Sequence, residues 1–146
     1  MEPTDLSSEL ALAKKAAEAS GKLLQKQKKQ FNEILSSNSK DIKLKADTES
    51  EELIKEIITS QSAYPILSEE SGKSSEKLGD IFWVVDPLDG TASYNRDIPF
   101  CCVSIGLVNN MKPVLGAIYD FNNDQMYFGD TINNLSKMNK SLINVS

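Results

Sequence analysis

Histidine is absent from this chain of 146 residues. The chain therefore offers no Ser/His/Asp triad, no imidazole acid–base chemistry and no imidazole metal ligand. No stretch approaches the roughly 18 apolar residues of a membrane helix, and the N-terminus lacks the basic and apolar regions of a signal peptide. These absences predict a cytoplasmic protein with no membrane partner. Any catalysis must use carboxylates, hydroxyls or metal ions.

Cysteine and clustered positive charge are also scarce. Cys101 and Cys102 are the only cysteines, and neighbours in sequence do not reach unstrained disulfide geometry, so we predict reduced thiols that pack as small hydrophobic residues. The net charge is −5 and the pI is near 4.8, which excludes nucleic acid as a bulk partner. A small phosphate remains a suitable ligand if bound divalent metal reverses the local charge.

The amounts of hydrophobic and charged residues, 40% and 25%, are ordinary for a soluble globular domain, so residues 1–146 are expected to form one domain. Apolar residues at three- and four-residue spacing predict a long helix from Thr4 or Asp5 to Leu35. Its lysine-rich part, 22–29, is interpreted as a solvated helix end rather than a phosphate-binding surface. A short edge strand is predicted over 41–47.

A second helix is predicted over 47–61, where Thr48 and Glu51 have the spacing of a capping box. Beyond it the apolar pattern changes to that of strands. The predicted strands cover 64–71, 81–86, 100–108, 112–121 and 125–130. Short connections favour antiparallel pairing of successive strands. The expected fold class is α+β, with an antiparallel β-sheet and two long helices packed on one face.

Acidic residues occur where predicted strands end. Glu69 and Glu70 end one strand, and Asp86 and Asp89 flank the turn after the next. Pro87 fixes its backbone and bends the chain, so the two aspartates can converge, and converging carboxylates repel unless a cation or proton lies between them. Mg²⁺ suits such hard oxygen ligands. Each motif alone also fits a plain turn or a solvated loop; their combination favours a metal site.

The segment WVVDPLDGT, residues 83–91, is preceded by ILSEESG and followed by YNRDIPFCCVSIGLV. Together these segments resemble the inositol monophosphatase family of magnesium-dependent, lithium-sensitive phosphatases. The wider superfamily includes fructose-1,6-bisphosphatases and 3′-phosphoadenosine 5′-phosphate phosphatases. The resemblance extends over nearly the whole chain. It implies the N-terminal layer of the sugar-phosphatase fold and hydrolysis of a small phosphate monoester by a metal-activated water.

The resemblance also implies a ligand set for two Mg²⁺ ions. Glu69, Asp86 and the carbonyl of Leu88 would bind the first ion. Asp86 and Asp89 would bind the second. A metal-bound water becomes a usable nucleophile near neutral pH while the ions neutralise phosphoryl charge, so no histidine or protein nucleophile is needed.

Catalytic and substrate-binding roles are implied in the same way. The backbone N–H groups of Gly90 and Thr91 would bind the phosphate at a short helix start, which suits an anion. The Thr91 hydroxyl, supported by Asp47, would orient and deprotonate the attacking water together with Glu69. Glu70 would be a supporting acid behind the ligands.

The chain departs from the family pattern in two places. The family continues into a second α/β layer with a further aspartate in a WDxAAG-like motif, whereas Trp83 is the only tryptophan here. We therefore expect an N-terminal domain without its C-terminal domain, as an excised domain, a natural fragment or a split gene product, with weak or absent turnover. A homodimer or the missing C-terminal half is the expected macromolecular partner. After Gly-Thr the chain has ASYN, whereas the family often has Asn-Phe. This difference leaves the substrate preference undetermined.

Inositol monophosphate or a related sugar phosphate is the favoured substrate. A 3′(2′),5′-bisphosphate nucleotidase is the alternative enzyme. A truncated module that binds metal or phosphate without turnover is the alternative from another class, and a plain α+β interaction domain is the least favoured.

Overall fold

The computed structural model describes residues 6–37, 42–132, 135–138 and 141–144. The helices are α1 (Ser7–Lys26), α2 (Lys28–Phe31), α3 (Lys45–Gln61) and α4 (Thr91–Asn95). The strands are β1 (Ile34–Ser37), β2 (Ile42–Leu44), β3 (Ile66–Ser68), β4 (Gly72–Lys73), β5 (Ile81–Asp89), β6 (Cys102–Asn109), β7 (Lys112–Asp120), β8 (Gln125–Asp130), β9 (Leu135–Met138) and β10 (Ser141–Asn144). Within these ranges, no helix has the length and apolar content needed to cross a membrane.

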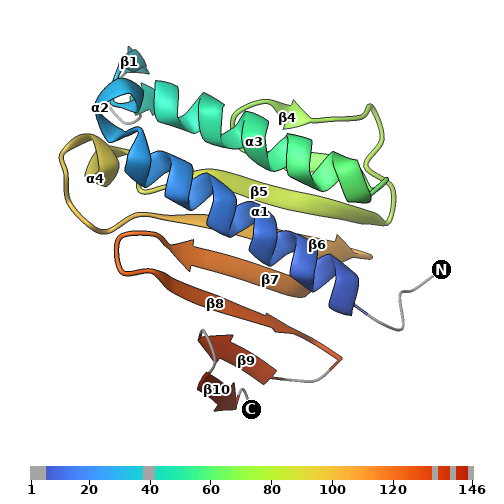
Figure 1. Cartoon of the computed structure of the whole chain (residues 1–146). Coiled ribbons are helices and arrows are strands. Elements are labelled where there is room, and N and C mark those ends of the chain that lie inside the picture. Colours follow the sequence, from blue (N-terminus) through green and yellow to red (C-terminus); the bar gives the residue numbers. More distant parts are fainter. Residues whose placement is uncertain (1–5, 38–41, 133–134, 139–140, 145–146) are drawn as a thin grey trace.

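In the part of the chain that the structure describes, eight strands form the main sheet, in the order β10-β9-β8-β7-β6-β5-β3-β4 (Figure 1). From β5 to β10 each strand pairs antiparallel with the next; this confirms the prediction for β5 to β8, whereas β9 and β10 were not predicted. The prediction of a wholly antiparallel sheet is wrong at β3, which lies parallel to β5. After β3 the chain forms the edge strand β4 and then returns to the other side of β3, and this longer connection permits the parallel pairing. The fold is α+β with a mixed sheet.

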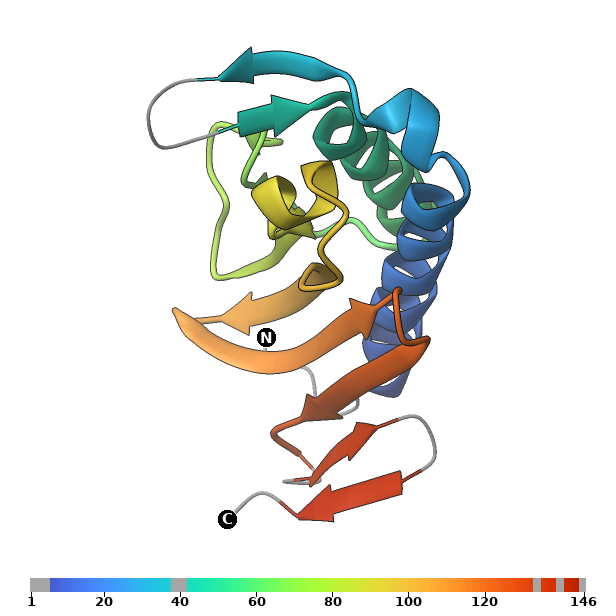
Figure 2. The ribbon, with the colours of Figure 1, turned by 90° about the vertical axis from the view of Figure 1, so that its left-hand side faces the viewer.

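Both long helices cover the same face of the sheet, as predicted (Figures 1 and 2). Helix α1 packs on β6, β7 and β8, and α3 packs on α1 and β5. The buried face of α1 consists largely of small side chains, which let the helix lie close to the strands: Ala13, Ala16, Ala17, Ser20 and Gly21. Trp83 and Val85 of β5 are buried on the helix side, whereas Val84 between them is 38% exposed. The opposite face of the sheet is not covered by either helix.

The first helix is shorter than predicted. Its expected start at Thr4 or Asp5 lies outside the described residues, and α1 ends at Lys26 instead of continuing to Leu35. Phe31, the last residue of the single turn of α2, is buried. After it the chain becomes extended, and Ile34 pairs with Leu44 in a separate two-stranded sheet of β1 and β2. This pairing overrides the helical spacing of the sequence.

Helix α3 begins two residues before the predicted start, and Thr48 and Glu51 do not form its cap. The Leu44 N–H donates a hydrogen bond of 2.7 Å to Asp47 Oδ2, so Asp47 closes the first turn. The Thr48 hydroxyl instead donates to the Lys45 carbonyl. Glu51 is 6% exposed and bonds to other segments.

A candidate metal and phosphate site

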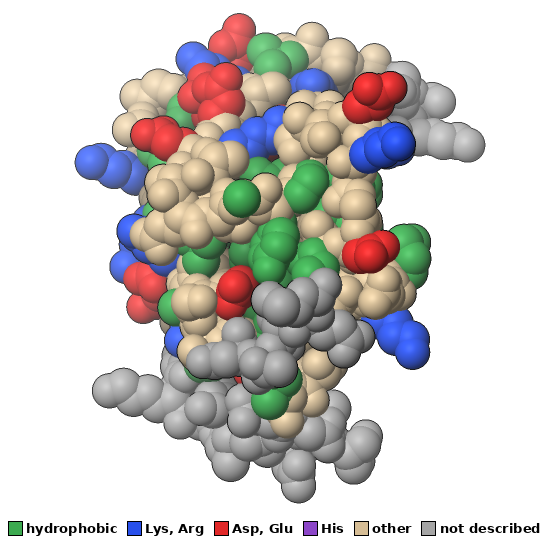
Figure 3. Space-filling model, turned by 90° about the vertical axis from the view of Figure 1, so that its right-hand side faces the viewer, with side chains coloured by type: hydrophobic (Ala, Val, Ile, Leu, Met, Phe, Trp, Pro, Cys, Tyr) green, Lys and Arg blue, Asp and Glu red, His purple; other side chains and the backbone are tan. Residues whose placement is uncertain are grey.

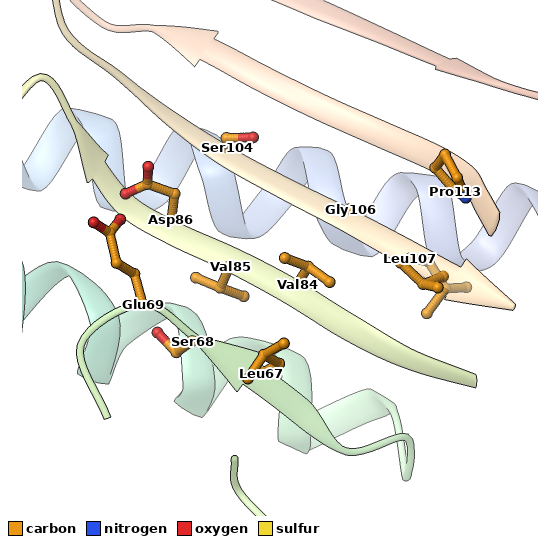
Figure 4. A pocket seen from close by; sticks show the side chains of 11 residues that line it. Leu67, Ser68, Glu69, Val84, Val85, Asp86, Ser104, Gly106, Leu107 and Pro113 are labelled. Carbon is orange, nitrogen blue, oxygen red and sulfur yellow. The ribbon is translucent and has the colours of Figure 1, made fainter. Parts of the chain in front are cut away.

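The carboxylates of Glu69 and Asp86 meet at one edge of the sheet. Ser68 of β3 lies beside Val85 of β5, and the Glu69 N–H donates to the Val85 carbonyl at 3.1 Å. Because β3 and β5 are parallel, both strands deliver their following residues to the same edge. Figure 4 shows the two carboxylates pointing toward one another. We call Glu69, Asp86 and Asp89, with Asp47 and Thr91, the acidic site.

A β-bulge places Asp89 on the same side as Asp86. Asp86 pairs with Ser104 and Asp89 with Cys102, so β5 holds one more residue than β6 in this interval. Residues three apart in a regular strand point to opposite faces, and the extra residue reverses this for Asp89. In agreement, Leu88 is buried and Asp89 is exposed. The DPLD motif is therefore a bulge within a strand, not the turn that the sequence suggested.

Asp86 holds its proton more strongly than an ordinary aspartate. Burial is the largest cause, followed by the hydrogen bond and negative charge of Glu69 and then the charge of Asp89, and together they raise the pKa of Asp86 to about 7. The Leu88 N–H, 3.3 Å from Asp86 Oδ1, acts in the opposite direction. Like charges confined together favour either a proton or a cation between them.

Thr91 and Asp47 form a hydrogen-bonded pair beside these carboxylates. The Thr91 hydroxyl is 2.9 Å from Asp47 Oδ1 and 3.2 Å from the Leu88 carbonyl, so its proton is directed into the protein. Asp47 is 1% exposed, and burial raises its pKa against the lowering effect of its hydrogen bonds from Leu44 and Thr91. A hydroxyl held in this way can accept a proton on its oxygen as it passes its own to the carboxylate.

Gly90 joins β5 to α4 and has no room for a side chain. Its φ of 93° is left-handed, and an added Cβ would lie 2.5 Å from the Phe100 carbonyl oxygen. This backbone conformation starts α4 directly at Thr91.

Glu70 forms an ion pair with the small sheet. Its carboxylate lies 3.4 Å from the Lys43 ammonium of β2. Burial, and secondarily the charge of Asp47, raise the pKa of Glu70, while Lys43 lowers it. Glu70 therefore adds to the negative charge behind the acidic site and is partly balanced by Lys43.

The donor set fits a hard cation in part. Glu69 and Asp86 converge as two carboxylate ligands should, but the described part of the chain contains no group of three or more His, Cys, Asp or Glu residues arranged to hold a metal ion. Cys102 is not a ligand of choice, because burial raises the pKa of its thiol to about 12 and its Sγ lies 3.8 Å from Asp89 Oδ2. Neither cysteine forms a disulfide, as predicted.

A hollow of about 590 Å³ runs along the uncovered face of the sheet from the acidic site (Figure 4). Glu69 and Asp86 line one part of it, and Leu67, Val84 and Pro113 line an apolar part. A ligand in this hollow would meet charge at one side and hydrophobic surface at the other.

Sequence reasoning missed Ser50 and assigned Glu51 to the wrong role. Both are buried, and both bond to the segments that carry the site. The available signal was their spacing: they lie three and four residues after Asp47 and therefore on the same helix face.

Known proteins resemble this chain in both sequence and structure. The Aquifex aeolicus fructose-1,6-bisphosphatase/inositol-1-monophosphatase is 37% identical over 127 residues, which are 82% of this chain and 46% of that protein. The structure of the Anabaena (Nostoc) inositol monophosphatase superposes with a TM-score of 0.80 at 35% identity, covering 97% of this chain and 50% of the other. CysQ from Bacteroides thetaiotaomicron, described as a bacterial member of the inositol monophosphatase family, gives a TM-score of 0.74 at 30% identity over 95% of this chain and 51% of its own.

The chain thus spans about half the length of these relatives. Residues 5–146 match the sequence profile of the inositol monophosphatase family, which is nearly the full chain. The match includes the bulge of β5, the acidic residues after β3 and the start of α4. On this evidence the chain belongs to the inositol monophosphatase family.

Proposed function

We propose that this chain provides the metal-binding half of a magnesium-dependent phosphomonoesterase that acts on inositol monophosphate or a related small sugar phosphate. The observation that carries the proposal is the meeting of Glu69 and Asp86 next to the hydrogen-bonded pair of Thr91 and Asp47. Phosphate hydrolysis by an activated water requires acidic metal ligands next to a hydroxyl that is oriented by hydrogen bonds.

Glu69, Asp86, Asp89 and the Leu88 carbonyl would hold Mg²⁺ in this proposal. When bound, Mg²⁺ neutralises the charge of the phosphoryl group and lowers the pKa of a water molecule bound to it. A cation bound there would replace the proton that Asp86 holds, because either of them reduces the repulsion between neighbouring carboxylates.

Thr91 and Asp47 would act on the attacking water. The Thr91 oxygen accepts a proton from the water and passes its own proton to Asp47 Oδ1, along the existing 2.9 Å hydrogen bond. Burial of Asp47 raises its pKa and so favours this acceptance. The backbone N–H groups of Gly90 and Thr91, at the start of α4, would bind phosphate oxygens.

A second candidate is a module that binds metal or phosphate without turnover. One observation favours it: the described residues include no group of three or more acids arranged to hold a metal ion. In this alternative Glu69 and Asp86 bind a cation, and no hydrolysis follows.

Two measurements test these functions. First, thermal unfolding of wild type with and without Mg²⁺ or Mn²⁺ should show stabilisation by metal, and Asp86→Asn should abolish most of it. Asp80→Asn is the matched control, because it removes the same charge at an exposed position outside the acidic site.

Second, phosphate release from inositol monophosphate with excess Mg²⁺ separates the two candidate functions. Metal stabilisation with hydrolysis supports the phosphatase, and stabilisation alone supports the module. No response to metal overturns the phosphatase and a metal-binding module.

A further inference from the structure

One face of helix α3 contacts every segment that contributes to the acidic site. Ser50 and Glu51 lie three and four residues after Asp47, so all three project from the same side of the helix. Their exposures are 1%, 0% and 6%, which places three polar side chains in the interior within a single turn. Asp47 bonds to Thr91, as described above, and the other two bond to the segments that carry the metal-binding carboxylates.

Ser50 fixes the bulge of β5. Its hydroxyl donates a hydrogen bond of 2.7 Å to the carbonyl of Pro87, the residue between Asp86 and Leu88. The register between β5 and β6 is irregular from Asp86 to Asp89, so this part of the strand has weaker support from the sheet than the rest. A buried hydrogen bond from the helix therefore supplies a fixed point for Asp86.

Glu51 fixes the end of β3. Its Oε1 accepts hydrogen bonds from the Ser68 hydroxyl and from the Ser71 N–H, the latter at 3.2 Å, and these residues flank Glu69 and Glu70 on both sides. Burial opposes ionisation of Glu51, but the bonds from Ser68 and Ser71 and the charge of Lys55 outweigh it and lower the pKa. A charged acceptor makes stronger hydrogen bonds than a neutral one.

Glu51 is not itself a metal ligand in this arrangement. Oε1 is engaged by Ser68 and Ser71, and Oε2 lies 3.6 Å from the Lys55 ammonium. Lys55 also donates to the Ser71 hydroxyl, so the charge of Glu51 is balanced on the same helix. The role that remains for Glu51 is to position the residues that follow β3.

We propose that Ser50 and Glu51 are positioning residues that fix the carboxylates of Asp86 and Glu69 relative to one another before any cation binds. This rests on the proposed function of the acidic site. Strand β3 has only three residues, and the two carboxylates repel when both are ionised. Because both segments are bonded to one helix, the repulsion does not separate them. Cation binding then costs less conformational entropy, since the carboxylates are already in place.

Mn²⁺ binding measured by electron paramagnetic resonance of the free ion tests the proposal without relying on turnover. Glu51→Leu should raise the Kd for Mn²⁺ by roughly tenfold or more. Ser50→Ala should raise it by roughly a few-fold. Glu51→Gln should recover most of the affinity, because its amide oxygen still accepts from Ser68 and Ser71. Ile58→Val is the control: it lowers stability in the core two turns further along α3 and should leave the Kd unchanged.

Loss of stability alone does not account for this pattern. Kd values for Glu51→Leu and Ser50→Ala that equal those of wild type and Ile58→Val would overturn the proposal, with circular dichroism showing that each variant is folded. Ser50→Ala removes one hydroxyl and keeps the test available if Glu51→Leu does not fold.

Absence of Mn²⁺ binding in the wild type would overturn the proposed function instead. Amide hydrogen exchange then decides the positioning role alone. Faster exchange in Glu51→Leu confined to 68–72, and in Ser50→Ala confined to 86–91, supports it. Exchange unchanged in those segments, or raised uniformly over the chain, overturns it.

Discussion

At the scale of single residues, Asp86 makes the stability of the metal-free protein depend on pH. Its pKa is raised to about 7 in the folded chain against an ordinary value of 3.8, so the folded state binds more protons between these values. Stability contributed by protonated Asp86 is complete below the lower value and is lost as the pH rises through the higher one. Metal-free wild type should therefore lose stability, relative to Asp86→Asn, as the pH increases.

Urea unfolding in the presence of a chelator measures this loss. One pKa unit corresponds to about 1.4 kcal/mol, and solvent screening at this partly buried site reduces the expected difference between about pH 5 and about pH 8 to on the order of 1–2 kcal/mol. Asp80→Asn, at an exposed position, should follow the wild type. A wild-type curve parallel to that of Asp86→Asn would show that Asp86 titrates normally.

Gly90 is a second position at which the surroundings determine the residue type. Alanine at this position would meet both the cost of a left-handed backbone and a contact of 2.5 Å with the Phe100 carbonyl. Gly79 has a similar φ of +71° but nothing within 4 Å of an added Cβ, so Gly79→Ala isolates the backbone cost. We expect roughly 1 kcal/mol from Gly79→Ala and about 2–4 kcal/mol from Gly90→Ala in urea unfolding. Equal losses would mean that the strand relaxes around the added methyl group.

At the scale of elements, the close approach of α1 to the sheet depends on Gly21. An added Cβ would lie 2.4 Å from Cδ2 of the buried Tyr119 ring and 3.1 Å from Cβ of Phe121. Alanine favours a helix by about 1 kcal/mol over glycine, whereas overpacking costs about 1–3 kcal/mol, so Gly21→Ala should be neutral to destabilising despite its helix propensity. Combining it with Tyr119→Leu should remove the overpacking and make Gly21→Ala favourable. A favourable effect already in the wild-type background would show that α1 has space at this position.

The elements also show what the sequence can and cannot predict. Strands β5 to β8 and the covering helices follow local patterns of apolar residues, and the structure confirms them. The bulge at Asp86–Asp89 was interpreted as a turn, because the pattern Asp-Pro-Xaa-Asp-Gly is compatible with both a turn and a β-bulge. The end of α1 and the pairing of Ile34 with Leu44 depend on contacts between distant segments, which no local pattern encodes. Spacing places Ser50 and Glu51 on the helix face of Asp47, but the distant segments to which they bond could not be predicted, for the same reason.

At the scale of the whole molecule, helices cover one face of the sheet and leave the other uncovered (Figure 2). Side chains on the uncovered face include Val84, Ile118 and Tyr127, which are 38%, 43% and 40% exposed, and Ile118 pairs directly with Tyr127 across β7 and β8. On the side of the molecule drawn in Figure 3, hydrophobic side chains also gather near the middle, with charged side chains around them. Exposed apolar side chains on the face of a sheet favour association in soluble proteins.

The uncovered face should therefore bind a hydrophobic dye and promote self-association of the isolated chain. Ile118→Lys should reduce both 8-anilinonaphthalenesulfonate fluorescence and the weight-average mass in sedimentation velocity, without loss of thermal stability, because the side chain is half exposed and does not fill the core. Met111→Lys is the control, since Met111 is 81% exposed at the tip of the β6–β7 hairpin and does not lie within the sheet. If both substitutions reduce association equally, the effect comes from the added positive charge on an acidic protein and not from the uncovered face.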